Sequence, residues 1–279
     1  MKISGFTVVR NAIRYDYPVK ESILSVLPVC DEFIINVGKS DDDTLNLIKS
    51  IDSPKIKVIE TEWDFSRGMS ELERQTDKAL ELCSGDWAFY IQADEVVHER
   101  DLNRLKKTML KYLHNEDVEG IRFRWMHFYG SFYRYRIDAG WFQKQDRIIR
   151  NNGNIRSYSE AWGFRRKNGE PINTVKLRCF IYHYGWVKKI GFKIDNAQEM
   201  GGRTEAFIEK IKPKFDFKDL DKFPVYFGTH PAVMREKVVA HFPSQKDWAN
   251  IKKKYFWSPL LWFRIRYKTF IRRKKALVK

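Results

Sequence analysis

The stretch that decides the fold is Gly85-Asp86-Trp87-Ala88-Phe89-Tyr90-Ile91-Gln92-Ala93-Asp94-Glu95-Val96. Its first two residues predict a turn that ends a helix, and the apolar, aromatic run 87–91 predicts a strand covered on both faces. Two adjacent carboxylates, Asp94 and Glu95, follow where that strand ends. Ligands of open α/β sheets bind at this end of the strands, and Mg²⁺ or Mn²⁺ binds one or two carboxylates together with substrate phosphates. The simpler alternative is that Asp94 caps a following helix.

The same stretch closes a regular alternation of strands and helices. Strands are predicted at 3–9, 33–37, 56–59 and 87–91, and helices from Pro18, at 44–51 and at 69–83. Such alternation within 95 residues predicts a parallel, doubly wound sheet. The pattern then changes. A helix is predicted around 102–113, a strand-like, aromatic and basic region at 120–183 with a turn at 151–153, and a further helix at 187–200.

The composition bounds the class of protein. With 279 residues and 43% hydrophobic content, the chain can bury the core of one large domain, with or without an appendage. It has no run of about 18 apolar residues, so no transmembrane helix is predicted, and no signal peptide is expected. The three cysteines are far apart and odd in number. They indicate free, buried thiols in a reduced cytosolic protein rather than a disulfide framework or a zinc site.

The chain is strongly basic, with a formal net charge of +16. This charge indicates an acidic partner: nucleic acid, an anionic membrane or phosphate-bearing substrates. Much of it lies at 245–279, where twelve Lys or Arg residues interleave with aromatic residues and accompany one acid, Asp247. Such a mixture predicts binding to an anionic membrane surface. The alternatives are single-stranded nucleic acid and a C-terminal helix packed on the domain.

Four short motifs occur in order along the first hundred residues. They are Arg10-Asn11, Ser40-Asp41-Asp42-Asp43-Thr44, Glu73-Arg74-Gln75 and Gln92-Ala93-Asp94. In this order they resemble the first nucleotide loop and the S-x-D-x-T, A-R-N and D-x-D motifs of the family-2 glycosyltransferases. These are inverting sugar-nucleotide enzymes of the GT-A fold. The resemblance covers about residues 1–100 and, more loosely, the chain to about 190.

The resemblance implies a donor site. Its residues here are Arg10, Asn11, Asp42, Arg74, Gln92 and Asp94. It implies that Asp42 contacts the base or ribose and that Arg74 reaches a phosphate. The alternatives are an N-cap for Asp42 and an exposed helix arginine for Arg74.

The resemblance also implies a divalent cation, Mn²⁺ or Mg²⁺, beside the donor diphosphate. Gln92 stands where the family has the first aspartate of D-x-D, so the ion would rest on Asp94, with Glu95 and His183 as helpers. His183 ends an apolar strand, where GT-A enzymes often place a late histidine that binds the metal. The alternative for His183 is a hydrogen-bonded core histidine.

Glu160 is the predicted catalytic base. It follows the turn at 151–153 and lies between Tyr158 and Trp162, as suits a sugar-binding pocket. The stretch resembles lipopolysaccharide-type members of the family in which a histidine–glutamate pair follows a strand pair, with Ser159 in place of the histidine. The rival bases are Asp138 and Asp146. The non-catalytic alternative is a surface glutamate paired with Arg165 or Arg166.

Together these features predict an α/β protein with a GT-A-like, Rossmann-like, doubly wound mixed sheet. Residues 1–100 would form its nucleotide-sugar-binding half, 101–240 its acceptor-side half and 241–279 a basic, aromatic tail. The predicted activity is inverting transfer of a sugar from a nucleotide-sugar donor to a glycan or glycolipid, in the biosynthesis of cell-surface polysaccharide or lipopolysaccharide. The predicted place is the cytoplasm, at the inner face of the plasma membrane.

Two other hypotheses remain open at this stage. The charge alone suggests a nucleic-acid-binding protein, although no helix-turn-helix, zinc-finger or RNP signature occurs. Gln92 suggests a GT-A-fold protein that has lost its activity. Nucleotide-sugar binding with metal-dependent turnover would exclude both.

Overall fold

A computed structural model gives the path of the chain, and it describes residues 1–68, 70–136, 144–187, 220, 223–241, 243–244 and 247–250. Three predictions lie outside these residues: the helix at 187–200, except for its first residue, the rival base Asp138, and nearly all of the basic tail.

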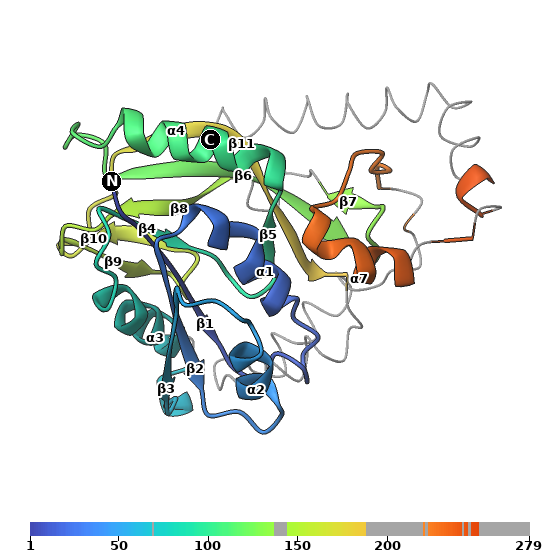
Figure 1. Ribbon diagram of the computed structural model, residues 1–279, viewed down its shortest axis with the longest axis horizontal. Coiled ribbons are helices and arrows are strands. Elements are labelled where there is room, and N and C mark those ends of the chain that lie inside the picture. The colour runs from blue at the N-terminus through green and yellow to red at the C-terminus, as the bar shows by residue number, and fades with distance from the viewer. Residues whose placement is uncertain are drawn as a thin grey trace.

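Four parallel strands form the first half of the sheet, in the order β3-β2-β1-β4 (Figure 1). Their bounds are β1 Ile3–Val9, β2 Glu32–Gly38, β3 Ile56–Thr61 and β4 Trp87–Tyr90. These are the four strands that the sequence predicts, extended by a residue or two at some ends. The order follows from right-handed crossovers through helices, which place successive strands side by side and then return to the centre of the sheet.

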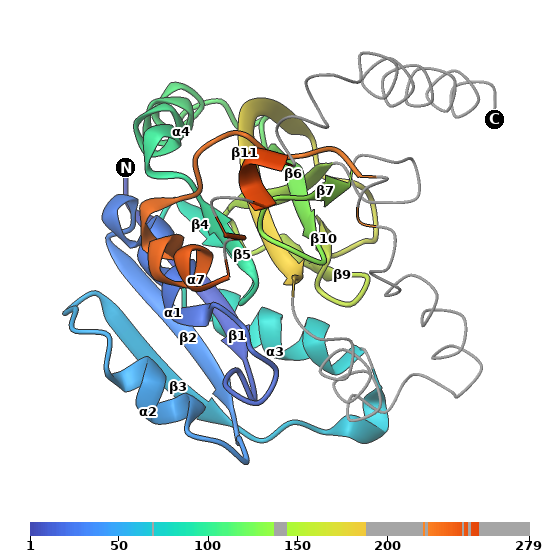
Figure 2. The same ribbon diagram turned by 90° about the vertical axis from the view of Figure 1, so that its right-hand side faces the viewer.

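Helices cover both faces of this half. Their bounds are α1 Val19–Val26, α2 Thr44–Lys49, α3 Ser70–Glu81 and α4 Glu99–Lys111, with short 3₁₀ turns η1 Leu27–Val29 and η2 Phe65–Arg67. Figure 2 shows α1, α2 and α4 on one side of the sheet and α3 on the other. The strands supply both interfaces because their side chains alternate. In β4, Trp87 and Phe89 pack in the core under α1, whereas Ala88 and Tyr90 pack in the core under α3.

The second half of the sheet is mixed, in the order β8-β6-β11-β5. The bounds of these strands are β5 Glu95–Val97, β6 Gly120–Tyr129, β8 Lys144–Arg150 and β11 Thr174–Trp186, and the short β7 Tyr135–Arg136 pairs with β6. A separate hairpin is formed by β9 Ile155–Tyr158 and β10 Gly163–Arg166. β8 joins the two halves because it pairs antiparallel with both β4 and β6. The predicted α/β class and doubly wound mixed sheet are confirmed.

The sheet must curl, because β4 and β5 are joined only by residues 91–94 although β8, β6 and β11 lie between them in the sheet. Neighbouring strands are about 4.8 Å apart, so such a short link can connect strands this far apart in the order only if the sheet is strongly curved. The curl brings the start of β5 to the carboxyl end of β4. That is the place where the sequence predicts a site.

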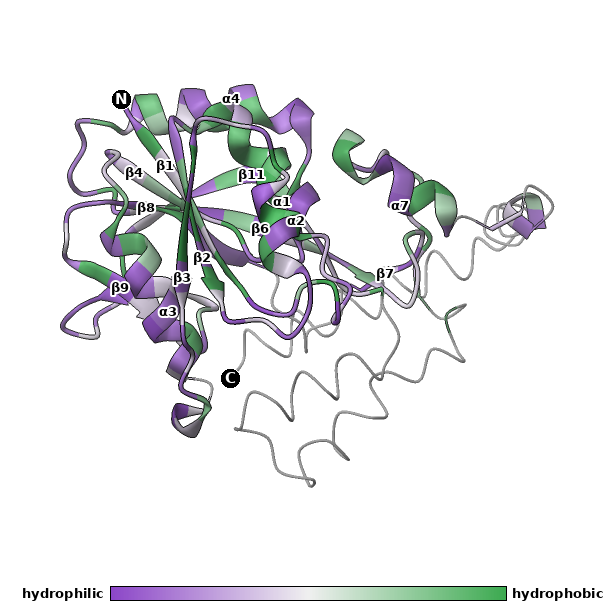
Figure 3. Cartoon of the chain, turned by 60° about the horizontal axis from the view of Figure 1, so that its bottom comes forward, coloured by the Kyte–Doolittle hydropathy of each residue, from purple (hydrophilic) through white to green (hydrophobic). Residues whose placement is uncertain are grey.

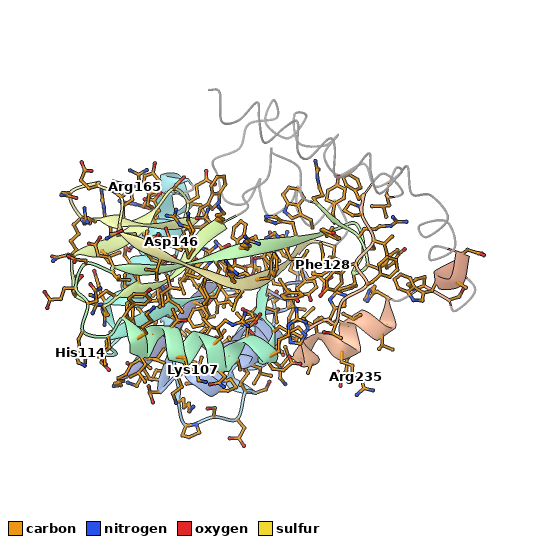
Figure 4. The ribbon with its side chains drawn as sticks, turned by 90° about the horizontal axis from the view of Figure 1, so that it is seen from above. Lys107, His114, Phe128, Asp146, Arg165 and Arg235 are labelled. Atoms are coloured by element: carbon orange, nitrogen blue, oxygen red, sulfur yellow. The ribbon has the colours of Figure 1, made fainter. Side chains whose placement is uncertain are left out.

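The hydropathy of the chain follows this arrangement, since the central parallel strands β1, β2 and β4 are largely apolar and the helices carry both apolar and polar residues (Figure 3). A short C-terminal segment, η5 Ala232–Met234 and α7 Arg235–Ala240, packs on an aromatic cluster around Phe128 (Figure 4). None of the helices in the described part of the chain combines the length and apolar character that crossing a membrane requires. All three cysteines are free and buried, as predicted.

Candidate active site

The carboxyl end of β4 leads directly into a buried pair formed by Asp94 and His183. The carboxylate Oδ2 of Asp94 lies 3.3 Å from Nε2 of His183, and the two side chains are 12% and 9% exposed. The backbone fixes the approach, because the amide of Tyr184 donates to the carbonyl of Asp94 at 2.8 Å. Asp94 therefore does not cap a helix. A strand follows it, and the N-cap of α4 is His98.

Gly185 makes this close approach sterically feasible. A Cβ atom on Gly185 would overlap Oδ2 of Asp94 and would lie 3.0 Å from Nε2 of His183. Real side chains essentially never show contacts that short. A residue larger than glycine here would have to displace Asp94, His183 or both.

Two further side chains orient His183 from the neighbouring strand β6. His183 pairs in register with His127, and the Nδ1 atoms of the two rings are 3.1 Å apart. Trp125 stacks on His183 with ring centroids 5.4 Å apart. His183 is therefore held on both its nitrogens and on one ring face, which fixes the direction of Nε2 toward Asp94. His127 had no distinctive setting in the sequence, and its role depends on the pairing of β6 with β11.

Glu95 has a different partner from the one the sequence suggested. Arg147 on β8 donates from Nε to Oε2 and from Nη2 to Oε1 of Glu95, each at 2.8 Å, and both side chains are fully buried. Burial lowers the pKa of Arg147, but the adjacent Glu95 carboxylate raises it by more, so the pKa lies above its usual value. Both oxygens of Glu95 are thus engaged by a cation of the protein, and the expectation that Glu95 helps to bind a metal is replaced by this ion pair.

Gln92 connects the end of β4 to the turn between β9 and β10. Its Nε2 donates to the carbonyl of Ala161 at 3.1 Å, and its Oε1 accepts from Nη2 of Arg147 at 3.3 Å. Its own backbone amide donates to Glu95 at 3.1 Å. The residue that departs from the D-x-D pattern therefore belongs to a hydrogen-bond network with Arg147 and Glu95.

Glu160 lies in a strained turn between β9 and β10. Ser159, Glu160 and Ala161 have φ angles of 53°, 59° and 60°. Three consecutive non-glycine residues in the left-handed region are rare, and each costs about 1–3 kcal/mol. The amide of Glu160 donates to the Glu73 carboxylate on α3 at 2.9 Å. The predicted surface partners have other contacts, since Arg166 pairs with Glu119, and Arg165 (labelled in Figure 4) lies over the ring of Tyr158.

The rival base Asp146 is held by an arginine. Its two carboxylate oxygens accept from Nε and Nη2 of Arg122 at 2.7 and 2.9 Å. The hydrogen bond to Asp146 raises the pKa of Arg122. A carboxylate in a two-pronged ion pair is a poor proton acceptor, because protonation would break the pair. Figure 4 shows Asp146 within the sheet rather than in a loop at its edge.

The loops after β1 and β2 lock together at the same end of the sheet. Arg10 donates to the carbonyl of Lys39 and to Asp41, at 2.7 and 3.1 Å. Asn11 takes a left-handed φ of 50°, and its side chain exchanges hydrogen bonds with Asp41 in both directions. Asp42 accepts from Thr44 at the start of α2 and from the amide of Arg14. These contacts hold the loop just before α2, and the N-cap of that helix is Asp43 rather than Asp42.

Arg74 is oriented by a buried acid that the sequence analysis missed. Glu71, whose side chain is fully buried, accepts from Nε and Nη2 of Arg74, the first at 2.7 Å. It also accepts from Gln75. Burial would raise the pKa of Glu71, but the hydrogen bond from Arg74 leads those that lower it below its usual value. The Arg74 side chain remains one-third exposed. It is therefore not the fully solvated helix arginine of the alternative.

A cavity of about 630 Å³ lies at the opposite end of the strands, beside Met1, Asp86 and Glu119. The hydrogen-bonding capacity of Arg150, which lines it, is already taken up by the fold. Arg150 donates to the carbonyls of Val118, Leu113, Tyr112 and Asn115. The amino ends of the strands that meet there carry no ligand site in folds of this class.

Comparison with known proteins gives distant structural similarities. No protein-family model and no curated protein sequence matches the chain. The crystal structure of S. aureus TarS 1-349 is similar over 80% of this chain and 74% of that chain, with 15% sequence identity and a TM-score of 0.43. Glucosyl-3-phosphoglycerate synthase from Mycobacterium tuberculosis, in complex with Mn²⁺, UDP and glucosyl-3-phosphoglycerate, is similar over 44% of each chain, with 18% identity and a TM-score of 0.32. Similarities of this size assign no role to any residue of this chain.

Proposed function

We propose that the protein is a glycosyltransferase that transfers a sugar from a nucleotide-sugar donor to a hydroxyl group of a glycan or glycolipid, with inversion at the anomeric carbon. The observation that carries the proposal is that the segment following β4 holds both the Asp94–His183 pair and, through Gln92, the turn of Glu160. Gln92, two residues before Asp94, is bonded to the turn that holds Glu160. Ligands of α/β sheets bind at this end of the strands.

The donor side of the site would be formed by the loops after β1 and β2 and by the start of α3. Arg10 and Asn11 shape the first two loops around Asp41. Arg74 points its guanidinium along Glu71 and keeps part of its surface in solvent. An arginine positioned in this way can bind a phosphate with its remaining N–H donors.

The pair Asp94 and His183 would hold a divalent cation. Among the described residues, no group of three or more His, Cys, Asp or Glu side chains could hold a metal ion. A two-residue site suits an ion that takes its other ligands from water and substrate phosphates. A carboxylate with an imidazole favours Mn²⁺ over Mg²⁺, because nitrogen ligands favour transition metals. When bound, such an ion supplies positive charge to the departing diphosphate.

Glu160 would act as the general base. Inversion requires attack from the face opposite the departing diphosphate, so the base must belong to a different segment from Asp94. The turn 159–161 meets this requirement because it lies in the acceptor-side half. As the acceptor oxygen bonds to the anomeric carbon and the bond to the diphosphate breaks, the Glu160 carboxylate would take the hydroxyl proton.

The base is tested by Glu160→Gln, which keeps the shape of the side chain and removes its basicity. The variant should fold and bind donor normally while turnover falls by a factor on the order of 10² to 10⁴. The measurement is the initial rate of nucleoside diphosphate release with a panel of sugar nucleotides, acceptor and Mn²⁺. The matched control is Glu170→Gln, at an exposed glutamate in the next turn. A normal rate in Glu160→Gln would show that Glu160 is not the base.

A further inference from the structure

The backbone conformation of the turn 159–161 is unfavourable by itself and needs support from the rest of the protein. Three non-glycine residues in succession have left-handed φ angles. Within the turn, the amide of Trp162 donates to the carbonyl of Ser159 at 3.0 Å. Strained backbone of this kind persists only where surrounding groups determine it.

Three hydrogen bonds from other elements hold the turn, each at a different peptide unit. The carboxylate of Glu73 accepts the amide of Glu160 at 2.9 Å. Gln92 donates to the carbonyl of Ala161 at 3.1 Å, and Nη1 of Arg147 donates to the carbonyl of Trp162 at 2.7 Å. Two of these three fasteners are side chains of one network, because Arg147 also donates to Gln92.

The Arg147 side chain is held in place by an ion pair and by two aromatic rings. Its guanidinium forms a two-pronged pair with Glu95 and lies 5.4 and 5.0 Å from the ring centroids of Tyr90 and Trp125. A planar guanidinium can serve a carboxylate, a carbonyl and two aromatic faces at once, whereas the single ammonium group of a lysine cannot. Trp125 also stacks on His183, so the same ring contacts the Asp94–His183 pair.

We propose that Gln92 and Arg147 are positioning residues that hold the strained turn of Glu160 against the end of β4 and so fix the base relative to Asp94. The proposal deepens the proposed function and rests on it for the role of Glu160. It assigns a purpose to the glutamine at position 92. The turn presents carbonyl oxygens, and only a side chain with N–H donors can bind them.

An aspartate at position 92 would be unsuitable for this task. It has no N–H to donate to the carbonyl of Ala161, and it is one methylene shorter than glutamine. It would also place a second carboxylate beside Glu95, in competition for Arg147. The departure from D-x-D thus exchanges a carboxylate for a donor that links the two halves of the site.

The test uses two variants of the full chain, Gln92→Glu and Gln92→Met. The first keeps the shape and removes the donor, and the second removes the hydrogen bond without adding a charge. Both should raise amide hydrogen exchange in 158–163 about tenfold, the effect of losing one such bond. Both should lower kcat on the order of 10²-fold, because a base displaced by about 1 Å loses its alignment. The KM for the donor should stay within about twofold in Gln92→Met.

A matched pair of arginine variants separates positioning from general stability. Arg147→Lys should reproduce the local exchange and the loss of kcat. Arg150 binds carbonyls at the other end of the sheet. Arg150→Lys should therefore leave kcat and the amide exchange of residues 158–163 unchanged. Unchanged exchange in both Gln92 variants would overturn the proposal, as would faster exchange with unchanged kcat.

The outcome for the base is read separately. Glu160→Gln should lower turnover by the factor given above without altering exchange in the turn. If Glu160→Gln is fully active, the assignment of the base is wrong and the positioning role falls with it. If Glu160→Gln is inactive but the Gln92 variants behave as wild type, only the positioning role is wrong.

Discussion

The two ends of the parallel strands differ in what their buried polar groups do. At the amino end, Glu32 accepts from Ser4, Ser84 and Lys57, the last at 2.6 Å. At the carboxyl end, Asp94 faces His183, and Gln92 and Arg147 hold backbone of another segment. The amino-end network closes on itself within the fold. The carboxyl-end network joins the segment after β4 to His183 on β11 and to the turn between β9 and β10.

Backbone strain is distributed in the same way. The described non-glycine residues with positive φ are Asn11, Asp16, Ser159, Glu160 and Ala161. All five lie in the loop after β1 or in the turn fastened to the end of β4, which are the loops of the candidate site. Strain concentrates at functional sites because precise placement of a side chain can require a costly backbone conformation. At the amino end, by contrast, we expect the buried Glu32 network to contribute to stability alone.

The largest effect expected from this comparison is on turnover in Asp94→Ala. The substitution removes the carboxylate at the end of β4, and turnover should fall on the order of 10²- to 10³-fold because the departing diphosphate loses stabilisation. The matched control is Asp86→Ala, which removes a carboxylate just before the same strand, where it binds the amide of Lys2. Initial rates under saturating donor decide the matter. Equal rates for Asp94→Ala and wild type would remove the functional contrast between the two ends.

A smaller effect, on stability rather than turnover, is expected in Glu32→Gln. Burial would raise the pKa of Glu32, but hydrogen bonds from Lys57, Ser4 and Ser84 lower it below its usual value. The variant should lower the free energy of unfolding at pH 7 by about 2 kcal/mol and leave kcat unchanged. Since the folded-state pKa is lowered, this contribution is present above the unfolded pKa of about 4.3 and is lost as pH falls below it.

Urea unfolding of wild type and Glu32→Gln at several pH values checks this expectation. The difference between the two proteins should be full at pH 7 and should shrink as the pH falls below about 4. A constant difference over that range, or a loss of kcat equal to that of Asp94→Ala, would contradict the assignment of the amino end to stability.

Most of the parallel half was predictable because its signals are local. The run 87–91 is apolar on both faces, and the structure buries Trp87 and Phe89 under one layer of helices and Ala88 and Tyr90 under the other. For the rest of the sheet, the sequence predicted a strand-like region at 120–183 but neither the bounds nor the pairing of its strands. β8 pairs with β4, where Trp87 lies opposite Arg150, and with β6, where Gly120 lies opposite Ile149, and no local pattern in the sequence encodes that partner choice.

The site was predictable where residues follow a strand and not where two segments meet. Asp94 was chosen because it follows a strand and His183 because it ends one, and the structure brings them together, with His183 inside β11 rather than at its end. Glu95 was grouped with Asp94 by adjacency, yet successive residues at a strand start point to opposite faces, and Glu95 turns to Arg147. Arg147 gave no such signal, because it ends the polar run Lys144-Gln145-Asp146-Arg147 and is buried only through the pairing of β8 with β4 and β6.

The central claim is that a nucleoside diphosphate and a divalent cation bind together at the Asp94 end of the sheet. Calorimetric titration of UDP, GDP, ADP and CDP into the wild-type protein, with Mn²⁺ and with excess chelator, tests it most directly. The account predicts that at least one of them binds in the presence of Mn²⁺, that chelator weakens binding at least about tenfold, and that Asp94→Ala weakens it equally in Mn²⁺. No binding by any of the four, or binding that neither the chelator nor Asp94→Ala changes, would contradict it.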